Sequence, residues 1–297
     1  MPNVSVIIPF YNHLHWLKEA IESVLNQNYN DYEIVLINDG SSEDISLITP
    51  FLDNQNISYY SQTNRGPSSA RNNGIRISKG KYLAFLDSDD LFLQDKLLLQ
   101  VKILDECPEV VLCHTSYQWM DEQGQALEII HSGKFSGSVY PHIYDSCPIA
   151  TPTVMVRKMT LQNTNCFNEG VRIGEDVLLW AEIANHGLVY GIDLPLAFIR
   201  MHGQNAATDY RTQIIGDNNI INYGILKAHN ISWSQRRRIL SNKYHNLAYN
   251  NYRVNEQKKA LKNLAYSFWY NPFSESSKIF SILLRKRNKI NTLYSNV

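Results

Sequence analysis

The sequence predicts an α/β fold, with a mostly parallel sheet flanked by helices and an all-helical extension at the C-terminal end. Short β-branched runs alternate with amphipathic helical segments over roughly the first two thirds of the 297 residues, as in βαβ units. Polar clusters directly follow several of these runs, and beyond Asp209 the pattern becomes helical. We therefore expect two domains, residues 1–210 and residues 211–297.

The predicted strands are short and apolar, and most end at a Pro, Gly or Asp cluster. They are residues 4–8, 33–38, 57–60, 82–86, 110–113, 153–156 and 189–192. The predicted helices carry apolar residues at helical spacing. They are residues 14–25, 69–78, a segment around 97–104, and 176–186, with Gly80 and Gly187 as expected C-terminal glycines. Further on, Ser232–Gln235 has a capping-box pattern, Asn255 is expected to start the next helix and Pro272 to limit it.

The charge is unevenly distributed along the chain. Residues 227–297 hold 14 Lys or Arg against two Glu, a net +12, whereas residues 1–226 hold 14 against 26, a net −12. The basic segment could meet an anionic surface, or it could pack against an acidic body. Both interpretations stay open.

Cysteine usage and hydropathy bear on location. The four cysteines show no Cys-x-x-Cys spacing, which favours a reducing compartment and argues against a zinc ribbon. No signal peptide and no apolar run of 18 or more residues are evident. We expect a cytoplasmic location, with peripheral contact at the inner face of the membrane as an option.

The most polar loops are expected to meet in one crevice. Residues 9–12, 39–42 and 87–90 each follow a predicted strand. In an open parallel sheet, the loops after the strand ends form the ligand crevice. This inference uses no motif.

Residues 85–92, FLDSDDLF, place Asp87 and Asp89 two positions apart at a strand end. A divalent cation would relieve the repulsion between these carboxylates, and their hard oxygens suit Mg²⁺ or Mn²⁺. A turn or helix cap, where Asp is also favoured, explains the same residues. Asn38–Ser42 is likewise either a ribose or base contact or a turn. Neither a G-x-G-x-x-G nor a P-loop motif occurs.

Five blocks in order resemble the inverting glycosyltransferases of family 2, which have the GT-A fold. They are VSVIIPFYN (4–12), EIVLINDGSS (33–42), NRGPSSARNNG (64–74), GKYLAFLDSDD (80–90) and GEDVLLW (174–180). The resemblance covers residues 3–205 approximately, and five ordered blocks are more specific than any single motif.

The resemblance implies a set of site residues. Donor nucleotide contacts fall on Pro9, Tyr11, Asn12, Asp39, Arg71, Asp87 and Ser88. Asp89 is implied to bind the metal, with His202, in an Arg-x-His element followed by Gln204-Asn205, as a metal or phosphate contact. Asp90 would support the acidic motif or start a helix. Asp176 is implied as the catalytic base, with Glu175 as its acceptor-side neighbour.

The chemistry of such an enzyme needs these residue types. A cation stabilises the departing diphosphate, and a carboxylate takes the proton from the acceptor hydroxyl. A base on the face opposite the leaving group gives inversion. We expect the dipole of the helix that begins near Asp176 to favour its ionised form by about 0.3–1 kcal/mol.

The implied function is a metal-dependent, inverting transfer of a sugar, of the hexosyl or N-acetylhexosaminyl type. The expected donor is a nucleotide sugar, with a UDP-sugar favoured by the resemblance. The expected acceptor is a glycan or lipid-linked glycan in surface polysaccharide biosynthesis. The basic, aromatic segment 256–294 is expected to meet anionic lipid or to pack on protein, and no nucleic-acid motif accompanies it. Two alternatives remain: a sugar nucleotidyltransferase, and a non-catalytic glycan-binding or scaffold protein at the membrane.

Overall fold

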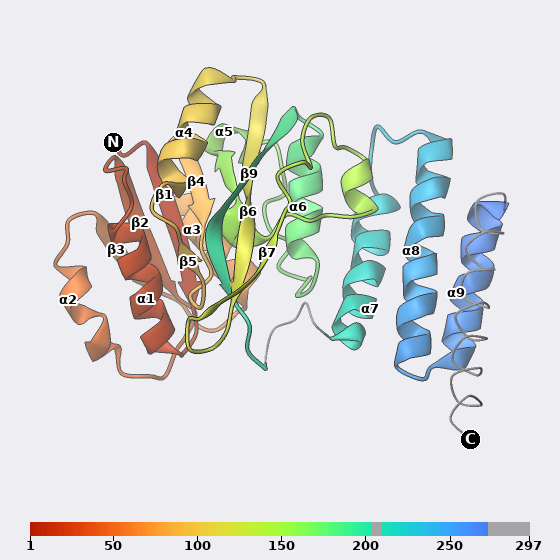
Figure 1. Ribbon diagram of the computed structural model, residues 1–297, viewed down its shortest axis with the longest axis horizontal. Helices are drawn as coiled ribbons and strands as arrows, with labels where there is room; N and C mark the ends of the chain where they lie inside the picture. Colours follow the sequence, from red (N-terminus) through yellow and green to blue (C-terminus); the bar gives the residue numbers. More distant parts are fainter. Residues whose placement is uncertain (204–208, 273–297) are drawn as a thin grey trace. The chain divides into compact units, whose positions relative to one another are not determined.

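A computed structural model of the chain describes residues 1–203 and 209–272 (Figure 1). The chain divides into two compact units, Met1–Asn205 and Ala206–Val297. The division falls near the predicted boundary after residue 210. Gln204, Asn205 and the basic residues beyond 272 lie outside the described residues.

Within the described residues, the N-terminal unit contains one nine-stranded sheet with the order β3-β2-β1-β4-β8-β6-β9-β5, and β7 pairs with β6. The strands are β1 (Val4–Phe10), β2 (Tyr32–Asn38), β3 (Ile57–Ser61), β4 (Tyr82–Phe85), β5 (Leu91–Phe92), β6 (Val110–Met120), β7 (Ala126–Ile130), β8 (Met155–Arg157) and β9 (Leu188–Arg200). Pairing is parallel through β3-β2-β1-β4 and between β6 and β9. It is antiparallel at the other junctions.

The strand directions bring distant loops to one edge of the sheet. β8 runs antiparallel to both β4 and β6, so β6 and its parallel partner β9 point the same way as β4. The carboxyl ends of β1, β2, β4 and β9 therefore lie at the same edge. The strand order reverses at β1, between β2 and β4, and such a switch point is where α/β sheets bind ligands.

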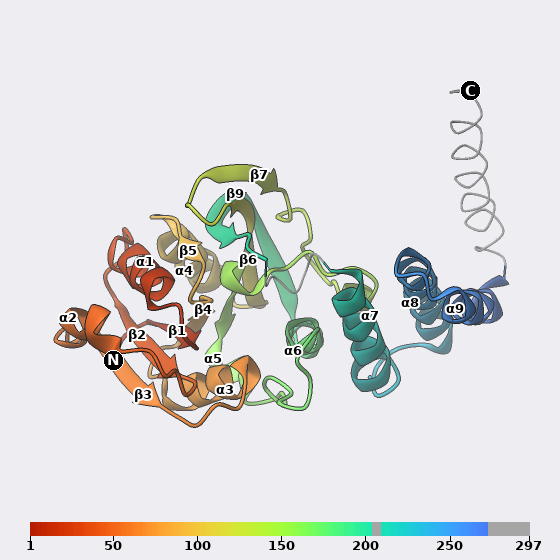
Figure 2. The same cartoon turned by 90° about the horizontal axis from the view of Figure 1, so that it is seen from below.

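Helices cover both faces of the sheet (Figure 2). α1 (Leu14–Leu25) and α4 (Lys96–Glu106) pack on the face formed by Val4, Val6 and Ile8, because alternate residues of a strand point to opposite sides. The other face carries α3 (Pro67–Ile77) and α6 (Glu175–Ala184). Short helices α2 (Thr49–Leu52) and α5 (Lys158–Leu161) lie in connections.

On that second face, an aromatic cluster anchors α6. Phe85 of β4 packs against Phe167 and Trp180, with ring centroids 5.4 and 5.7 Å away. Trp180 is fully buried, so the start of α6 is fixed relative to the end of β4.

The predicted α/β class with a helical C-terminal part is confirmed, and several local predictions are corrected. Residues 153–156 are not one strand: Thr151–Thr153 form a 3₁₀ turn, in which Thr153 Oγ1 donates to the Ala150 carbonyl at 2.7 Å, and β8 follows. Gly80 does not cap a helix. Instead, a Cβ atom at position 80 would lie only 2.5 Å from the Ser5 backbone nitrogen, so the close approach to β1 requires glycine.

Two further helix ends differ from prediction. α6 ends at Ala184 with Asn185 as its C-terminal cap, and Gly187 is needed because a Cβ there would lie 2.6 Å from Val111. Asn255 has a positive φ of 64° in the turn between two helices, and the next helix begins at Gln257.

The C-terminal unit is helical where it is described. It contains α7 (Tyr210–Asn219), a π-helical segment Ile220–Ile225, α8 (Trp233–Arg253) and α9 (Gln257–Tyr270). The predicted capping box is present, since Ser232 Oγ accepts from the Gln235 N–H. α8 and α9 approach closely at two small residues: Ser267 Oγ donates to the Ser241 carbonyl at 2.7 Å. No helix within the described ranges has both the length and the apolar character to cross a bilayer.

Candidate active site

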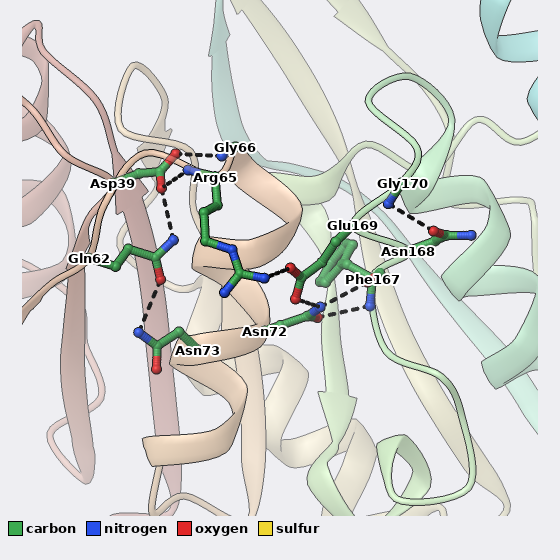
Figure 3. A network of polar contacts seen from close by, with 10 residues as sticks. All are labelled: Asp39, Gln62, Arg65, Gly66, Asn72, Asn73, Phe167, Asn168, Glu169 and Gly170. Atoms are coloured by element: carbon green, nitrogen blue, oxygen red, sulfur yellow. Dashed lines mark hydrogen bonds and ion pairs between the residues drawn. The ribbon is translucent and has the colours of Figure 1, made fainter.

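Asp39 organises the loop that follows β3 (Figure 3). Its Oδ1 accepts from Gln62 Nε2 at 2.8 Å and from the Arg65 N–H at 2.9 Å, and its Oδ2 accepts from the Gly66 N–H at 2.8 Å. The residue is 4% exposed. A carboxylate offers about four lone-pair positions, so Asp39 can accept another hydrogen bond while it holds this loop.

The loops after β1 and β2 are tied together beside Asp39. Ser41 Oγ donates to Asn12 Oδ1 at 2.9 Å and accepts from the Asn12 N–H at 3.2 Å. Pro9 is buried within β1, paired with Ile37, whereas Tyr11 is 51% exposed. Of the predicted nucleotide contacts here, Tyr11 and Asn12 therefore belong to the loop at the sheet edge, and Pro9 belongs to the strand below it.

Arg71 of α3 joins the acidic motif to the start of α6. Its Nη2 donates to Asp87 Oδ1 at 2.6 Å and its Nη1 to Glu175 Oε1 at 3.2 Å. Burial disfavours the charged guanidinium, but the carboxylates of Asp87 and Glu175 outweigh this effect and raise the pKa of Arg71. Residues from three separate blocks of the sequence thus form one charged cluster.

Glu175 and Asp176 begin α6, after Gly174 with a positive φ of 83°. Burial, followed by the charge of Asp176, raises the pKa of Glu175 to about 7, although Arg71 opposes the shift. Burial also raises the pKa of Asp176, against the Val177 N–H that donates to its Oδ1 at 2.8 Å. The start of α6 favours the ionised form of Asp176, as expected, but burial has the larger effect and shifts its pKa upward.

Asp89 faces His202, which follows the end of β9. Asp89 Oδ2 lies 2.8 Å from His202 Nε2, and the His202 side chain is 12% exposed. Ser88, between the two aspartates of the motif, is half-buried. Across the described part of the chain, no three His, Cys, Asp or Glu side chains are grouped as a complete metal site.

The pair nevertheless fits a cation that takes its other ligands from a diphosphate. A carboxylate oxygen and an imidazole nitrogen are both ligands of Mn²⁺-like ions. The turn is also rich in negative charge: burial, then the charges of Asp89 and Asp87, raise the pKa of Asp90 well above its usual range. A cation bound at Asp89 would offset this accumulation of carboxylates.

Asp90 does not start a helix. α4 begins at Lys96 with Asp95 as its N-cap, and the buried Asp90 carboxylate accepts from the Arg200 N–H at 2.8 Å. It thereby fixes the end of β9 to the acidic motif.

Two contacts at the site were not predicted from the sequence. Asn72 clamps the backbone of Phe167, donating to its carbonyl at 2.8 Å and accepting from its N–H at 2.9 Å (Figure 3). Arg65 pairs with Glu169 at 2.8 Å. Both link the α3 region to the segment that leads into Glu175. Asn72 lies in a block that marks the family, but the block's pattern gives no sign of a partner 95 residues away.

A sequence model described as "Glycosyl transferase family 2" matches residues 5–161, more than half of the chain. The chain belongs to this family. All of the loops described above except those that carry Glu169, Glu175 and His202 fall inside the match.

Relatives with curated names support the same family. A Rickettsia bellii protein called an uncharacterized glycosyltransferase is 50% identical over 68% of this chain, which spans 29% of that relative. The chain spans only about a third of the length of the first three curated relatives, at 29%, 36% and 36%. Another relative is the Escherichia coli UDP-Glc:alpha-D-GlcNAc-diphosphoundecaprenol beta-1,3-glucosyltransferase WfaP, which is 27% identical to the present chain. The aligned region covers 77% of the present chain and 89% of WfaP.

Solved structures show the GT-A fold. S. aureus TarS 1-349 in complex with UDP-GlcNAc superposes with a TM-score of 0.69 at 18% identity, covering 91% of this chain and 81% of that one. A Pyrobaculum calidifontis mannosyltransferase in complex with GDP-Man and Mn²⁺ gives 0.61 at 17% identity, covering 95% and 80%. The predicted fold family is confirmed.

Proposed function

We propose that the N-terminal unit transfers a sugar from a nucleotide diphosphate to an acceptor hydroxyl, with inversion at the sugar's C1. The observation that carries this proposal is the chain of contacts Asp87–Arg71–Glu175. It joins the acidic motif at the end of β4 to the two carboxyl groups that begin α6. Donor-binding and proton-accepting groups are thereby parts of one charged cluster.

The donor side of the proposal uses the switch-point loops. The nucleoside would lie against Tyr11 and Asn12, with Asp39 accepting a hydrogen bond from the base. Asp87 and Ser88 would lie near the ribose and diphosphate. A UDP-sugar is the proposed donor, supported by the UDP-Glc in the WfaP name and the UDP-GlcNAc bound to TarS.

Asp89 and His202 are the proposed protein ligands of a Mn²⁺ or Mg²⁺ ion. Bound there, the ion would stabilise the negative charge that the diphosphate gains as it leaves. The Mn²⁺ complex of the Pyrobaculum mannosyltransferase supports this assignment. Arg71 keeps Asp87 oriented, and Asp90 holds the turn against β9, so both ligands stay in place.

Asp176 is the proposed general base. Its carboxylate would accept the proton of the acceptor hydroxyl as the new bond to C1 forms, an effect typically worth about 10²- to 10⁴-fold. Burial raises the pKa of Asp176, and the Val177 N–H and nearby positive charge oppose that shift. Arg71, which lowers the pKa of Asp176, supplies part of that charge. Glu175 would hold the acceptor beside it.

The acceptor is proposed to be a glycan on a lipid diphosphate, as in the name of WfaP. An exposed apolar stripe on α9 supports contact of the C-terminal unit with an anionic membrane. Leu261, Phe268 and Trp269 are 68%, 48% and 74% exposed, and the exposed Lys258 and Lys262 lie on the same helix. Such a combination is typical of interfacial helices.

A thermal-shift panel of UDP-, GDP- and dTDP-sugars, each with Mn²⁺ and with EDTA, tests the proposed donor and its cation. The proposal predicts that UDP-sugars with Mn²⁺ raise the melting temperature most. Release of UDP in the presence of a GlcNAc-diphosphate-lipid acceptor then tests transfer. No response to any nucleotide sugar would instead favour a non-catalytic scaffold, and pyrophosphate release from UTP and a sugar phosphate would favour a nucleotidyltransferase.

A further inference from the structure

The fully buried Arg200 holds the backbone that carries Asp89. Its side chain is 1% exposed, yet its Nε donates to the Asp89 carbonyl at 2.9 Å and its Nη1 to the Glu122 carbonyl at 3.0 Å. Its Nη2 donates to Glu19 Oε2, on α1, at 2.5 Å. The guanidinium is therefore engaged by the protein on several sides, and Glu19 supplies a carboxylate in direct contact with its charge.

Trp16, one turn before Glu19 on α1, stacks on the imidazole of His202. The ring centroids are 5.1 Å apart with an interplanar angle of 26°. His13 stacks on Trp16 at 5.0 Å with the same angle, and the Arg200 guanidinium lies 5.4 Å from the Trp16 ring centroid. Trp16 thus contacts both Arg200, at the end of β9, and His202, which follows it, and both of these residues reach Asp89.

This stacking fixes the plane of an imidazole whose Nε2 must face Asp89. The terminal side-chain torsion of an imidazole has broad minima, so packing against the ring face helps to set its orientation. With one face covered by the indole, the ring keeps Nε2 at 2.8 Å from Asp89 Oδ2. A metal-binding side chain that is already oriented before the cation arrives does not lose conformational freedom on binding. Residues that orient such a side chain therefore increase the metal affinity of the site.

We propose that Trp16 and Glu19 are positioning residues of the cation site: Trp16 orients His202, and Glu19 holds Arg200 and, through it, Asp89. The inference rests on the cation ligands of the proposed function. It assigns a role to α1, a helix in which none of the predicted site residues lies. Neither residue touches the sugar or the reacting atoms.

Binding of Mn²⁺ to the full chain in the presence of UDP, followed by the electron paramagnetic resonance signal of free Mn²⁺, tests the proposal without any turnover. The variants are Trp16→Leu, Trp16→Phe and Glu19→Gln, with His202→Ala as the reference for a lost ligand. Glu22→Gln is the matched control, because Glu22 lies on the same helix with a side chain 45% exposed against 47% for Glu19, and its ion pair is with Lys18, at 3.7 Å. Melting temperatures are measured in parallel.

We expect about tenfold weaker Mn²⁺ binding for Trp16→Leu and Glu19→Gln, the range found when residues supporting metal ligands are changed. Trp16→Phe should recover most of the affinity, and Glu22→Gln should match the unaltered protein. A packing role alone would lower the melting temperature and leave Mn²⁺ affinity within twofold.

Suppose that Trp16→Leu and Glu19→Gln keep their Mn²⁺ affinity within about twofold, while His202→Ala binds Mn²⁺ at least about tenfold more weakly. This result overturns the positioning role but leaves the cation site standing. If the unaltered protein binds no Mn²⁺, or if His202→Ala binds it equally well, the assigned ligands are wrong and this inference falls with them. Should Trp16→Leu fail to fold, Glu19→Gln decides: an affinity equal to that of Glu22→Gln overturns the proposal.

Discussion

The guanidinium of Arg71 lies 2.6 Å from the carboxylate of Asp87, and both side chains are largely buried, at 7% and 29% exposure. The same guanidinium contacts Glu175 at 3.2 Å. One planar cation therefore holds together the end of β4 and the start of α6, and only Arg offers donors in a fork that can serve two carboxylates in this way.

Replacing Arg71 by Met should destabilise the protein by about 3–5 kcal/mol, because it leaves buried carboxylates without their cation. Urea unfolding measures this free energy. Arg71→Lys should recover only part of it, since a point charge does not bridge both partners. Arg76→Met, at an exposed position of the same helix, is the matched control and should change stability little. An Arg71→Met variant as stable as that control would contradict the structural role.

Asp176→Asn should lower the rate of sugar transfer by about 10²-fold or more and leave UDP affinity unchanged, because the amide cannot accept the acceptor's proton. Single-turnover kinetics and UDP calorimetry separate the two effects. Asp105→Asn, at a surface ion pair with Lys81, serves as the control and should retain both. Transfer at a near-normal rate by Asp176→Asn would rule out its role as base.

Lys96 predicts a specific pH dependence of stability. Burial lowers its pKa to about 7, while its Nζ donates to Gln100 Oε1 at 2.6 Å and lies 4.2 Å from the Phe92 ring centroid. The unfolded chain, with a lysine pKa of about 10.4, then binds more protons than the native state above pH 7. Stability should accordingly rise with pH between about 7 and 10, by at most about 1.4 kcal/mol per pH unit.

Urea unfolding between pH 6.5 and 9.5 measures this slope. Lys96→Met should remove it, because Met cannot titrate, whereas Lys102→Met, an exposed position on the same helix, should keep it. Parallel stability curves for the unaltered protein and Lys96→Met would show that Lys96 is charged in the native state.

The exposed stripe on α9 predicts binding to anionic vesicles. Replacing Leu261 and Trp269 together by Ser should reduce co-sedimentation with phosphatidylglycerol vesicles, since these side chains would bury apolar area at the interface. Met159→Ser, at a 69% exposed site of the N-terminal unit, is the control. Equal pellet fractions for all three proteins would exclude the stripe as the contact, and truncation after residue 255 would show whether any later segment binds.

The sheet and its polar edge were predictable from the sequence, because short β-branched runs and the loops after them are local signals. The order of the blocks also identified the family, which the match to residues 5–161 confirmed. What local pattern could not supply was long-range packing. Gly80 is required by the Ser5 backbone, and Asn72 binds a residue 95 positions away.

The direction of the pKa shift of Asp176 shows the same limit. Its place in the first turn of a helix is visible in the sequence, and that place favours the ionised form. Its burial, which has the larger effect on its pKa, depends on how α6 packs against β4 and α3 and is known only from the structure. The support that α1 gives to His202 through Trp16 is hidden for the same reason.

The proposed function depends above all on a cation that Asp89 binds and that helps to hold the donor's diphosphate. Calorimetry of UDP binding with Mn²⁺ and with EDTA, on the unaltered protein, Asp89→Asn and the control Asp95→Asn, tests it most directly. We expect Mn²⁺ to strengthen UDP binding by about tenfold or more in the unaltered protein and the control, and far less in Asp89→Asn. An Asp89→Asn variant that gains as much affinity from Mn²⁺ as the unaltered protein would contradict it.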